Sequence, residues 1–163
     1  MTITTRADIQ AMRGIAVLAV LAYHARMPFI KGGYLGVDIF FVVSGYLITG
    51  LVARAMRDER FSFAAFYWRR AWRLLPAAYA VFLACVLVSP WLLTVAEQRD
   101  FFKQLLGALT FTGNIALWLQ TGYFEQAAEL KPLLHVWSLA IEEQYYLLLP
   151  AAMVLVGPRR WRA

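Results

Sequence analysis

The chain contains two histidines, and each stands in an apolar stretch with other polar residues at helical spacing around it. His24 ends the apolar run that begins after Arg13, and His135 opens the run that contains Ser138 and Glu142. An ionisable side chain at membrane depth is costly, so such a residue generally has a function. An imidazole beside a carboxylate or a guanidinium can act as a general acid or base. These groups therefore predict a reaction centre within the membrane.

Arg13 and His24 are eleven residues apart, which on a helix is three turns plus roughly 20°, so they share a face. Their separation along the axis is about 16 Å, half of a hydrocarbon core. A guanidinium at one end and an imidazole deeper in suit an elongated anionic donor that enters from the cytoplasm. A structural alternative stays open, in which Arg13 extends to the lipid headgroups and His24 marks the opposite interface.

A second motif is the run Phe-Phe-Val-Val-Ser-Gly at residues 40–45, which Asp38 precedes. Ser44 and Gly45 are small residues that allow helices to approach closely, and plain helix packing is the favoured interpretation for them. Asp38 enters an apolar segment, where it could pair with an arginine or with His24. An interfacial charge is the alternative.

A third motif lies at residues 68–76, where Arg69, Arg70 and Arg73 alternate with tryptophans. Arg70 and Arg73 are helical neighbours at i,i+3, and Arg69 and Arg73 at i,i+4. Clustered guanidiniums at a membrane surface can bind phosphates in bidentate fashion. A topology anchor is the alternative, but three arginines within five residues exceed what anchoring needs.

In the fourth motif, His135, Ser138 and Glu142 are spaced i, i+3 and i+7 and so share a helical face. The pair Glu142-Glu143 inside an apolar block is costly unless it is paired or protonated. A carboxylate with an imidazole or guanidinium partner could be an acid/base or orienting unit. It could equally be a buried ion pair that holds helices in register.

The composition places these motifs in a membrane protein. Hydrophobic residues make up 61% of the chain and charged residues 16%, against about 25% charged in soluble domains. The apolar residues form blocks, of which those near 20 residues predict membrane spans. We therefore expect an all-α polytopic transmembrane helix bundle with four to five apolar segments, at about residues 9–27, 34–53, 74–96, 101–119 and 137–157.

The net charge of +6 reflects topology rather than nucleic-acid binding, because the arginines flank apolar spans instead of forming a solvated stripe. The connection at residues 54–73 holds six arginines and two acidic residues, which predicts that it and the N-terminus are cytoplasmic. The segment 101–119 is rich in glycine, threonine and asparagine. We favour a re-entrant segment there over a span, since a span would place the arginines at 159–162 outside.

Two further expectations concern the ends of the chain. Arg13 lies deep in the first apolar segment, and no small-residue cleavage pattern follows that segment, so we expect a retained helix rather than a signal peptide. The inward-facing polar residues need more helices to shield them than four or five segments supply. We therefore expect residues 1–163 to be the N-terminal part of a larger bundle.

The four motifs, in this order, resemble those of the acyltransferase-3 family of integral membrane acyltransferases, the O-antigen acetylase type. The matching motifs are Arg-x10-His at Arg13 and His24, Phe-Phe-x-x-Ser-Gly, Arg-x-x-Arg at Arg70 and Arg73, and His-x-Trp-Ser-Leu-x-x-Glu from His135 to Glu142. The resemblance runs from about residue 9 to residue 150.

This resemblance implies a bundle of about ten helices in the bacterial inner membrane, of which the chain matches the first half. Such enzymes move an acyl group, usually acetyl, from cytoplasmic acyl-CoA to a hydroxyl of a cell-envelope carbohydrate or lipid-linked glycan. No metal is expected. By motif match, His24 would be a general base or, less favoured, a transient acyl carrier. Arg13, Arg70 and Arg73, with Arg69 beside them, would bind the phosphates of acetyl-CoA, and Glu142 would support the site.

Two other functions stay open. Intramembrane histidine, glutamate and arginine also mark proton relays, so a proton-coupled transporter or channel is the competing class. The third possibility is that the chain is a fragment that is inactive without the C-terminal half of the bundle. The sequence does not identify the acceptor glycan.

Overall fold

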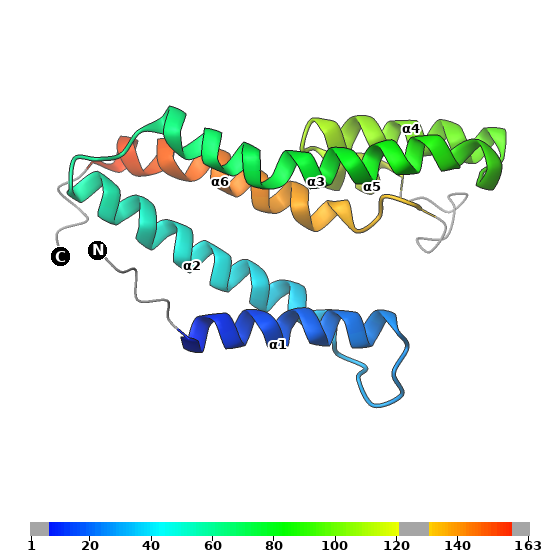
Figure 1. Cartoon of the computed structure of the whole chain (residues 1–163), viewed down its shortest axis with the longest axis horizontal. Coiled ribbons are helices and arrows are strands. Elements are labelled where there is room, and N and C mark those ends of the chain that lie inside the picture. The colour runs from blue at the N-terminus through cyan, green and yellow to red at the C-terminus, as the bar shows by residue number, and fades with distance from the viewer. Residues whose placement is uncertain (1–6, 121–130, 158–163) are drawn as a thin grey trace. The chain divides into compact units, whose positions relative to one another are not determined.

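The computed structural model describes residues 7–120 and 131–157, and these are helical with short connections (Figure 1). The chain divides into two compact units. The first unit holds α1 and α2, and the second, from Glu59 onward, holds α3 to α6. The helices are α1 (Ala7–His24), α2 (Leu35–Arg57), α3 (Phe63–Leu92), α4 (Val95–Leu109), α5 (Gly113–Leu119) and α6 (Val136–Val156).

Within the described residues, three helices are long and apolar enough to cross a membrane, namely α2, α3 and α6. This confirms the prediction of an all-α transmembrane protein, although four to five such segments were expected. The first predicted segment corresponds to α1, which has 18 residues and carries Asp8 and Arg13. The segment predicted at 74–96 belongs to a longer helix, because α3 begins at Phe63, where the hydroxyl of Ser62 accepts a hydrogen bond from the amide of Ala65.

The segment 101–119 is not one helix, because it breaks at residues 110–112 into α4 and α5. Phe111 in this turn has a left-handed φ of 54°. The two helices run antiparallel, since Gln104 donates to Gln120 across 3.0 Å and Gly107 lies against α5. A Cβ built at Gly107 would come within 2.8 Å of the Ala116 side chain, so this approach favours glycine. Both ends of the hairpin thus point the same way, as a re-entrant segment requires, and its place in a membrane stays a prediction.

A capping box starts the hairpin. Thr94 and Glu97 hydrogen-bond each other reciprocally at the first turn of α4. The amide and hydroxyl of Thr94 both donate to the Glu97 carboxylate, which lowers the pKa of that carboxyl below its ordinary value. The helix start is therefore most stable where Glu97 is ionised, and this contribution is lost as the pH falls through the lowered pKa.

A buried polar network fastens the hairpin to the start of α6. The Gln104 amide oxygen accepts a hydrogen bond from the backbone amide of Leu133, and the Lys131 ammonium donates one to the carbonyl of Gln120. Around it lies the apolar core of the second unit, made of Phe82, Phe101, Ala108, Leu133 and Val136. Buried polar groups are tolerated when they are hydrogen-bonded, so this network fixes how α4, α5 and α6 meet.

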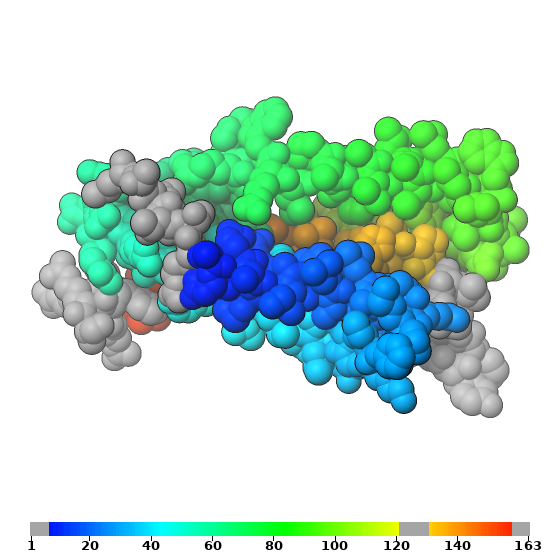
Figure 2. Space-filling view, turned by 60° about the horizontal axis from the view of Figure 1, so that its bottom comes forward, coloured from blue at the N-terminus to red at the C-terminus, as the bar shows by residue number. Residues whose placement is uncertain are grey.

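In the first unit, α1 and α2 form an antiparallel pair that meets at two glycines (Figure 1). A Cβ at Gly33 would lie 2.3 Å from the carbonyl oxygen of Ala19, and one at Gly36 would lie 2.3 Å from that of Ala16. Only a residue without a side chain allows this approach, which is the usual way that membrane helices pack. Figure 2 shows the exposed surface of α1 in blue.

We predict that Gly36→Ala separates α1 from α2, because the new methyl group meets a backbone carbonyl that cannot move aside. Overpacking of this kind costs about 1–3 kcal/mol of unfolding free energy. The measurement is thermal unfolding of the detergent-solubilised protein. Gly50→Ala is the matched control in the same helix, since nothing lies within 4 Å of a Cβ at that position. Equal melting temperatures for the two variants would contradict the packing described.

Candidate functional site

The first two sequence motifs meet in the first unit. The Arg13 guanidinium lies over the Phe40 ring, 5.0 Å from its centroid, so α2 holds the arginine of α1 by a cation–π contact. The Arg13 Nε is buried and has no hydrogen-bond partner among the described residues. Its remaining donors and its charge make Arg13 a candidate for binding an anion, and Phe40 is the residue that positions it.

His24 is the last residue of α1, and its side chain is exposed. Its Nδ1 lies 2.8 Å from the carbonyl oxygen of Val20. A carbonyl only accepts, so Nδ1 carries the hydrogen, and Nε2 of the neutral ring is left as an acceptor. The Tyr23 ring packs against the imidazole edge to face, with centroids 5.7 Å apart. This arrangement presents Nε2 as the basic atom.

Asp38 and Ser44, the other candidates of this unit, have different surroundings. Asp38 is exposed in the first turn of α2, where a negative charge is favourable to the helix dipole. It forms no ion pair with any residue of 7–120 or 131–157. Ser44 is buried within the helix, as packing of a small residue requires.

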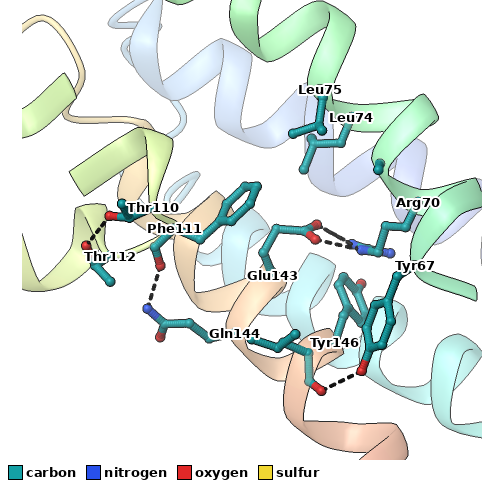
Figure 3. A pocket seen from close by; sticks show the side chains of 12 residues that line it. Tyr67, Arg70, Leu74, Leu75, Thr110, Phe111, Thr112, Glu143, Gln144 and Tyr146 are labelled. Atoms are coloured by element: carbon teal, nitrogen blue, oxygen red, sulfur yellow. Dashed lines mark hydrogen bonds and ion pairs between the residues drawn. The ribbon is translucent and has the colours of Figure 1, made fainter. Parts of the chain in front are cut away.

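In the second unit, Arg70 of α3 forms a bidentate ion pair with Glu143 of α6 (Figure 3). The Arg70 Nε lies 2.9 Å from both carboxylate oxygens, and Nη2 lies 2.6 Å from Oε1. The two side chains are only 21% and 11% exposed. A charge in such a setting is stable when it is paired with good geometry.

Two more residues extend this pair. The Arg70 guanidinium stacks on the ring of Tyr146, 3.2 Å from its centroid, and the Tyr146 hydroxyl donates to Glu142. Tyr146 is 2% exposed, so its ring is a fixed surface against which the guanidinium lies. We call Arg70, Glu143, Tyr146 and Glu142 the Arg70 cluster. Glu142, a predicted site residue, thus joins it through a tyrosine.

The other predicted residues of this unit lie outside the Arg70 cluster. Arg69 and Arg73 are exposed on α3, and no hydrogen bond or ion pair engages them within the described part of the chain. His135 is exposed at the residue before α6, and its carbonyl accepts from the Ser138 hydroxyl across 3.2 Å. The structure therefore brings Arg70 and Glu142 together and does not pair His135 with Glu142 among the residues it describes.

A cavity of about 320 Å³ opens beside the Arg70 cluster (Figure 3). Helix α3 supplies Tyr67, Arg70, Ala71, Leu74 and Leu75 to its wall. Helix α6 supplies Glu143, Gln144, Tyr146 and Leu147, and the turn between α4 and α5 supplies residues 110–112. Figure 3 shows Glu143 projecting between Arg70 and this turn. This cavity was not predicted from the sequence, because Tyr67, Gln144 and Tyr146 follow no spacing that marks a pocket.

Gln144 holds the turn in place. Its Nε2 donates to the carbonyl of Phe111 across 2.7 Å and to Oδ1 of Asn114 across 2.9 Å. Phe111 is the residue with the left-handed φ, a conformation that a bulky side chain adopts only when its surroundings enforce it. The amide of Gln144 therefore fixes the turn that closes the cavity.

We predict that Gln144→Leu loosens the turn, because the Phe111 carbonyl and the Asn114 side chain lose their donor. Amide hydrogen exchange at residues 110–114 should rise by about tenfold. Gln10→Leu, at an exposed position of α1, is the matched control and should leave this exchange unchanged. Unchanged exchange in Gln144→Leu would show that the turn holds its shape without this amide.

No three histidine, cysteine, aspartate or glutamate side chains lie close enough to hold a metal ion within residues 7–120 and 131–157. The groups that could do chemistry are an exposed imidazole at the end of α1, an arginine three turns earlier on α1 that lies over Phe40, and, in the other unit, a paired arginine next to a cavity. Together with the apolar helices, these features define an integral membrane protein with polar groups suited to acid–base chemistry and anion binding.

Comparison with known proteins identifies the family. The model described as "Acyltransferase domain" matches residues 6–163, and the chain belongs to this family. It is 38% identical over 154 residues to the peptidoglycan O-acetyltransferase OatA of Listeria monocytogenes. It is also 38% identical over 151 residues to the O-acetyltransferase OatA of Staphylococcus aureus. These matches cover 91% of the chain but 24% of each relative, so the chain spans about a quarter of their length. No solved structure matches the chain significantly.

Proposed function

We propose that the protein is a membrane acyltransferase that moves an acetyl group from cytoplasmic acyl-CoA to a hydroxyl of a cell-envelope glycan. The observation that carries this proposal is the family match over residues 6–163, together with relatives that are named O-acetyltransferases. The name of the Listeria relative supports peptidoglycan as the class of acceptor. We further propose that the chain acts together with the remaining, C-terminal helices of such a bundle.

The proposed location is the bacterial inner membrane, with a cytoplasmic N-terminus. The support comes from the three apolar helices and from the arginines between α2 and the apolar part of α3. Positive residues accumulate on the cytoplasmic side of membrane helices. A cytoplasmic donor would meet these arginines first, and the membrane orientation therefore agrees with the proposed reaction.

In the proposed reaction, His24 is the general base. Its Nε2 takes the proton of the acceptor hydroxyl while the hydroxyl oxygen bonds to the thioester carbonyl carbon. The carbon–sulfur bond then breaks, the thiolate of CoA leaves, and the imidazolium returns the proton to it. The hydrogen bond from Nδ1 to the carbonyl of Val20 supports this role, because it keeps Nε2 free of hydrogen in the neutral ring.

The arginines divide into two proposed roles. Arg70 is held by Glu143 and Tyr146, so its charge is already compensated, and we assign it to organising the wall of the cavity. Arg69 and Arg73 are exposed, which suits binding of the donor's phosphates. Arg13, held by Phe40, is the further candidate for an anionic group of the donor.

We predict that His24→Ala lowers the transfer of labelled acetyl from acetyl-CoA to peptidoglycan fragments by about a hundredfold or more. The measurement uses membranes from cells that express the protein. Thermal stability should not change, because His24 is exposed at a helix end. Gln10→Ala on the same helix is the control. Full transfer by His24→Ala would exclude this residue as the base.

We also predict that Arg73→Ala raises the KM for acetyl-CoA by about tenfold or more, because a charge-assisted hydrogen bond to a phosphate is lost. The turnover at saturating donor should change little. Arg73→Lys should recover only part of the affinity, since it lacks the planar fork. Arg99→Ala, at an exposed arginine of α4, is the charge-matched control. An unchanged KM in Arg73→Ala would refute this assignment.

A further inference from the structure

We propose that the cavity between α3, α6 and the turn at residues 110–112 receives the uncharged, amide-containing arm that carries the acyl thioester of the donor. This inference rests on the proposed function, since it assigns a part of the donor to a part of the site. No spacing in the sequence marks this cavity.

The cavity lies along one side of α3. The residues of α3 that face the cavity include Tyr67, Ala71 and Leu74, which share one helical face by their i, i+4, i+7 spacing. Arg70 lies at the edge of this face, and Arg73 lies one turn later, roughly 60° further round the helix and outside the cavity wall. A ligand whose phosphates bind Arg73 would therefore pass Arg70 before it reaches the cavity.

The wall of the cavity suits an uncharged ligand. Ala71, Leu74, Leu75 and Leu147 are apolar, and the charge of Arg70 is compensated by Glu143 at hydrogen-bond distance. The cavity thus offers no uncompensated charge to a ligand. An apolar pocket with a few polar groups favours a neutral ligand segment, and a volume of about 320 Å³ suits an extended arm better than an acetyl group alone.

The turn supplies a hydrogen-bond acceptor. Thr110 donates its hydroxyl hydrogen to the carbonyl of Leu106 across 2.9 Å. In the 2.8 Å contact between the two hydroxyls, Thr112 is then the donor and Thr110 the acceptor. The oxygen of Thr112 keeps its lone pairs, and although Thr112 is the N-cap of α5, it makes no capping hydrogen bond. Thr112 is one of the residues that line the cavity, and its oxygen can accept from the N–H of an amide.

The irregular backbone of the turn also favours a binding role. Non-helical backbone at membrane depth is tolerated where it lines a cavity. Phe111 in this turn has a left-handed φ. The side-chain amide of Gln144 fixes the turn, because it donates to both the Phe111 carbonyl and Asn114. A turn held this firmly against α6 keeps Thr112 at one place beside the cavity. Such pre-organisation is what a binding surface needs.

The test compares CoA with adenosine 3′,5′-bisphosphate, the part of CoA that keeps two of its three phosphates and lacks the arm. Equilibrium binding to the detergent-solubilised protein, expressed together with the remaining C-terminal helices of the proposed bundle, gives the Kd of each. Ala71→Leu places three more carbons in the cavity and should raise the Kd for CoA by about tenfold, while the Kd for the bisphosphate stays within about twofold. Ala84→Leu, at an exposed position of the same helix, is the matched control.

A second pair of variants guards against a folding defect. Thr112→Val keeps the shape and removes the acceptor, so it should weaken CoA binding several-fold and leave the bisphosphate unaffected. Thr112→Ser keeps the hydroxyl and should bind CoA as the parent does.

The outcomes separate the two proposals. If the parent protein binds CoA no tighter than the bisphosphate, or if Ala71→Leu and Thr112→Val alter both probes equally or neither, the cavity does not hold the arm, while the CoA donor stands. If the parent binds neither probe, the CoA donor itself is refuted, and the cavity assignment falls with it.

Discussion

The ion pair between Arg70 and Glu143 connects the two long apolar helices of the second unit, and the cavity beside it depends on this pair. Each charge stands on a long apolar helix, where an unpaired charge would be strongly unfavourable. The pairing joins α3 to α6 through long side chains and sets their register at this level. The cavity lies beside these long side chains, between the two helices. The Tyr146 ring, which stacks on the Arg70 guanidinium, forms part of its wall.

The rest of the site follows the same principle, in which one polar contact places another group. The amide of Gln144 holds the α4–α5 turn, and the carbonyl of Val20 selects the tautomer of His24. In the first unit, glycines let the backbones of α1 and α2 touch, and Phe40 then reaches Arg13. Each candidate chemical group is thus oriented by a neighbour whose own position is fixed by helix packing.

The helices and the groups that could do chemistry were predictable from the sequence, whereas the contacts between helices were not. Long apolar blocks can satisfy their backbone in a membrane only as helices, so α2, α3 and α6 were expected. The sequence did not predict that Glu143 rather than Glu142 pairs with Arg70. Adjacent residues on a helix point about 100° apart, and the sequence does not say which of the two directions faces α3. The contact of Phe40 with Arg13 depends likewise on a helix crossing that the glycines set.

A double-mutant cycle on the ion pair tests the central claim most directly. Unfolding free energies would be measured for Arg70→Met, Glu143→Met and the double variant in detergent. If the pair organises the unit, each single variant leaves an uncompensated charge. The loss of unfolding free energy in the double variant is then smaller than the sum of the two single losses by about 1 kcal/mol or more. Losses that add within about 0.5 kcal/mol would show that the two charges do not depend on each other, and the account of the cavity built on them would fail.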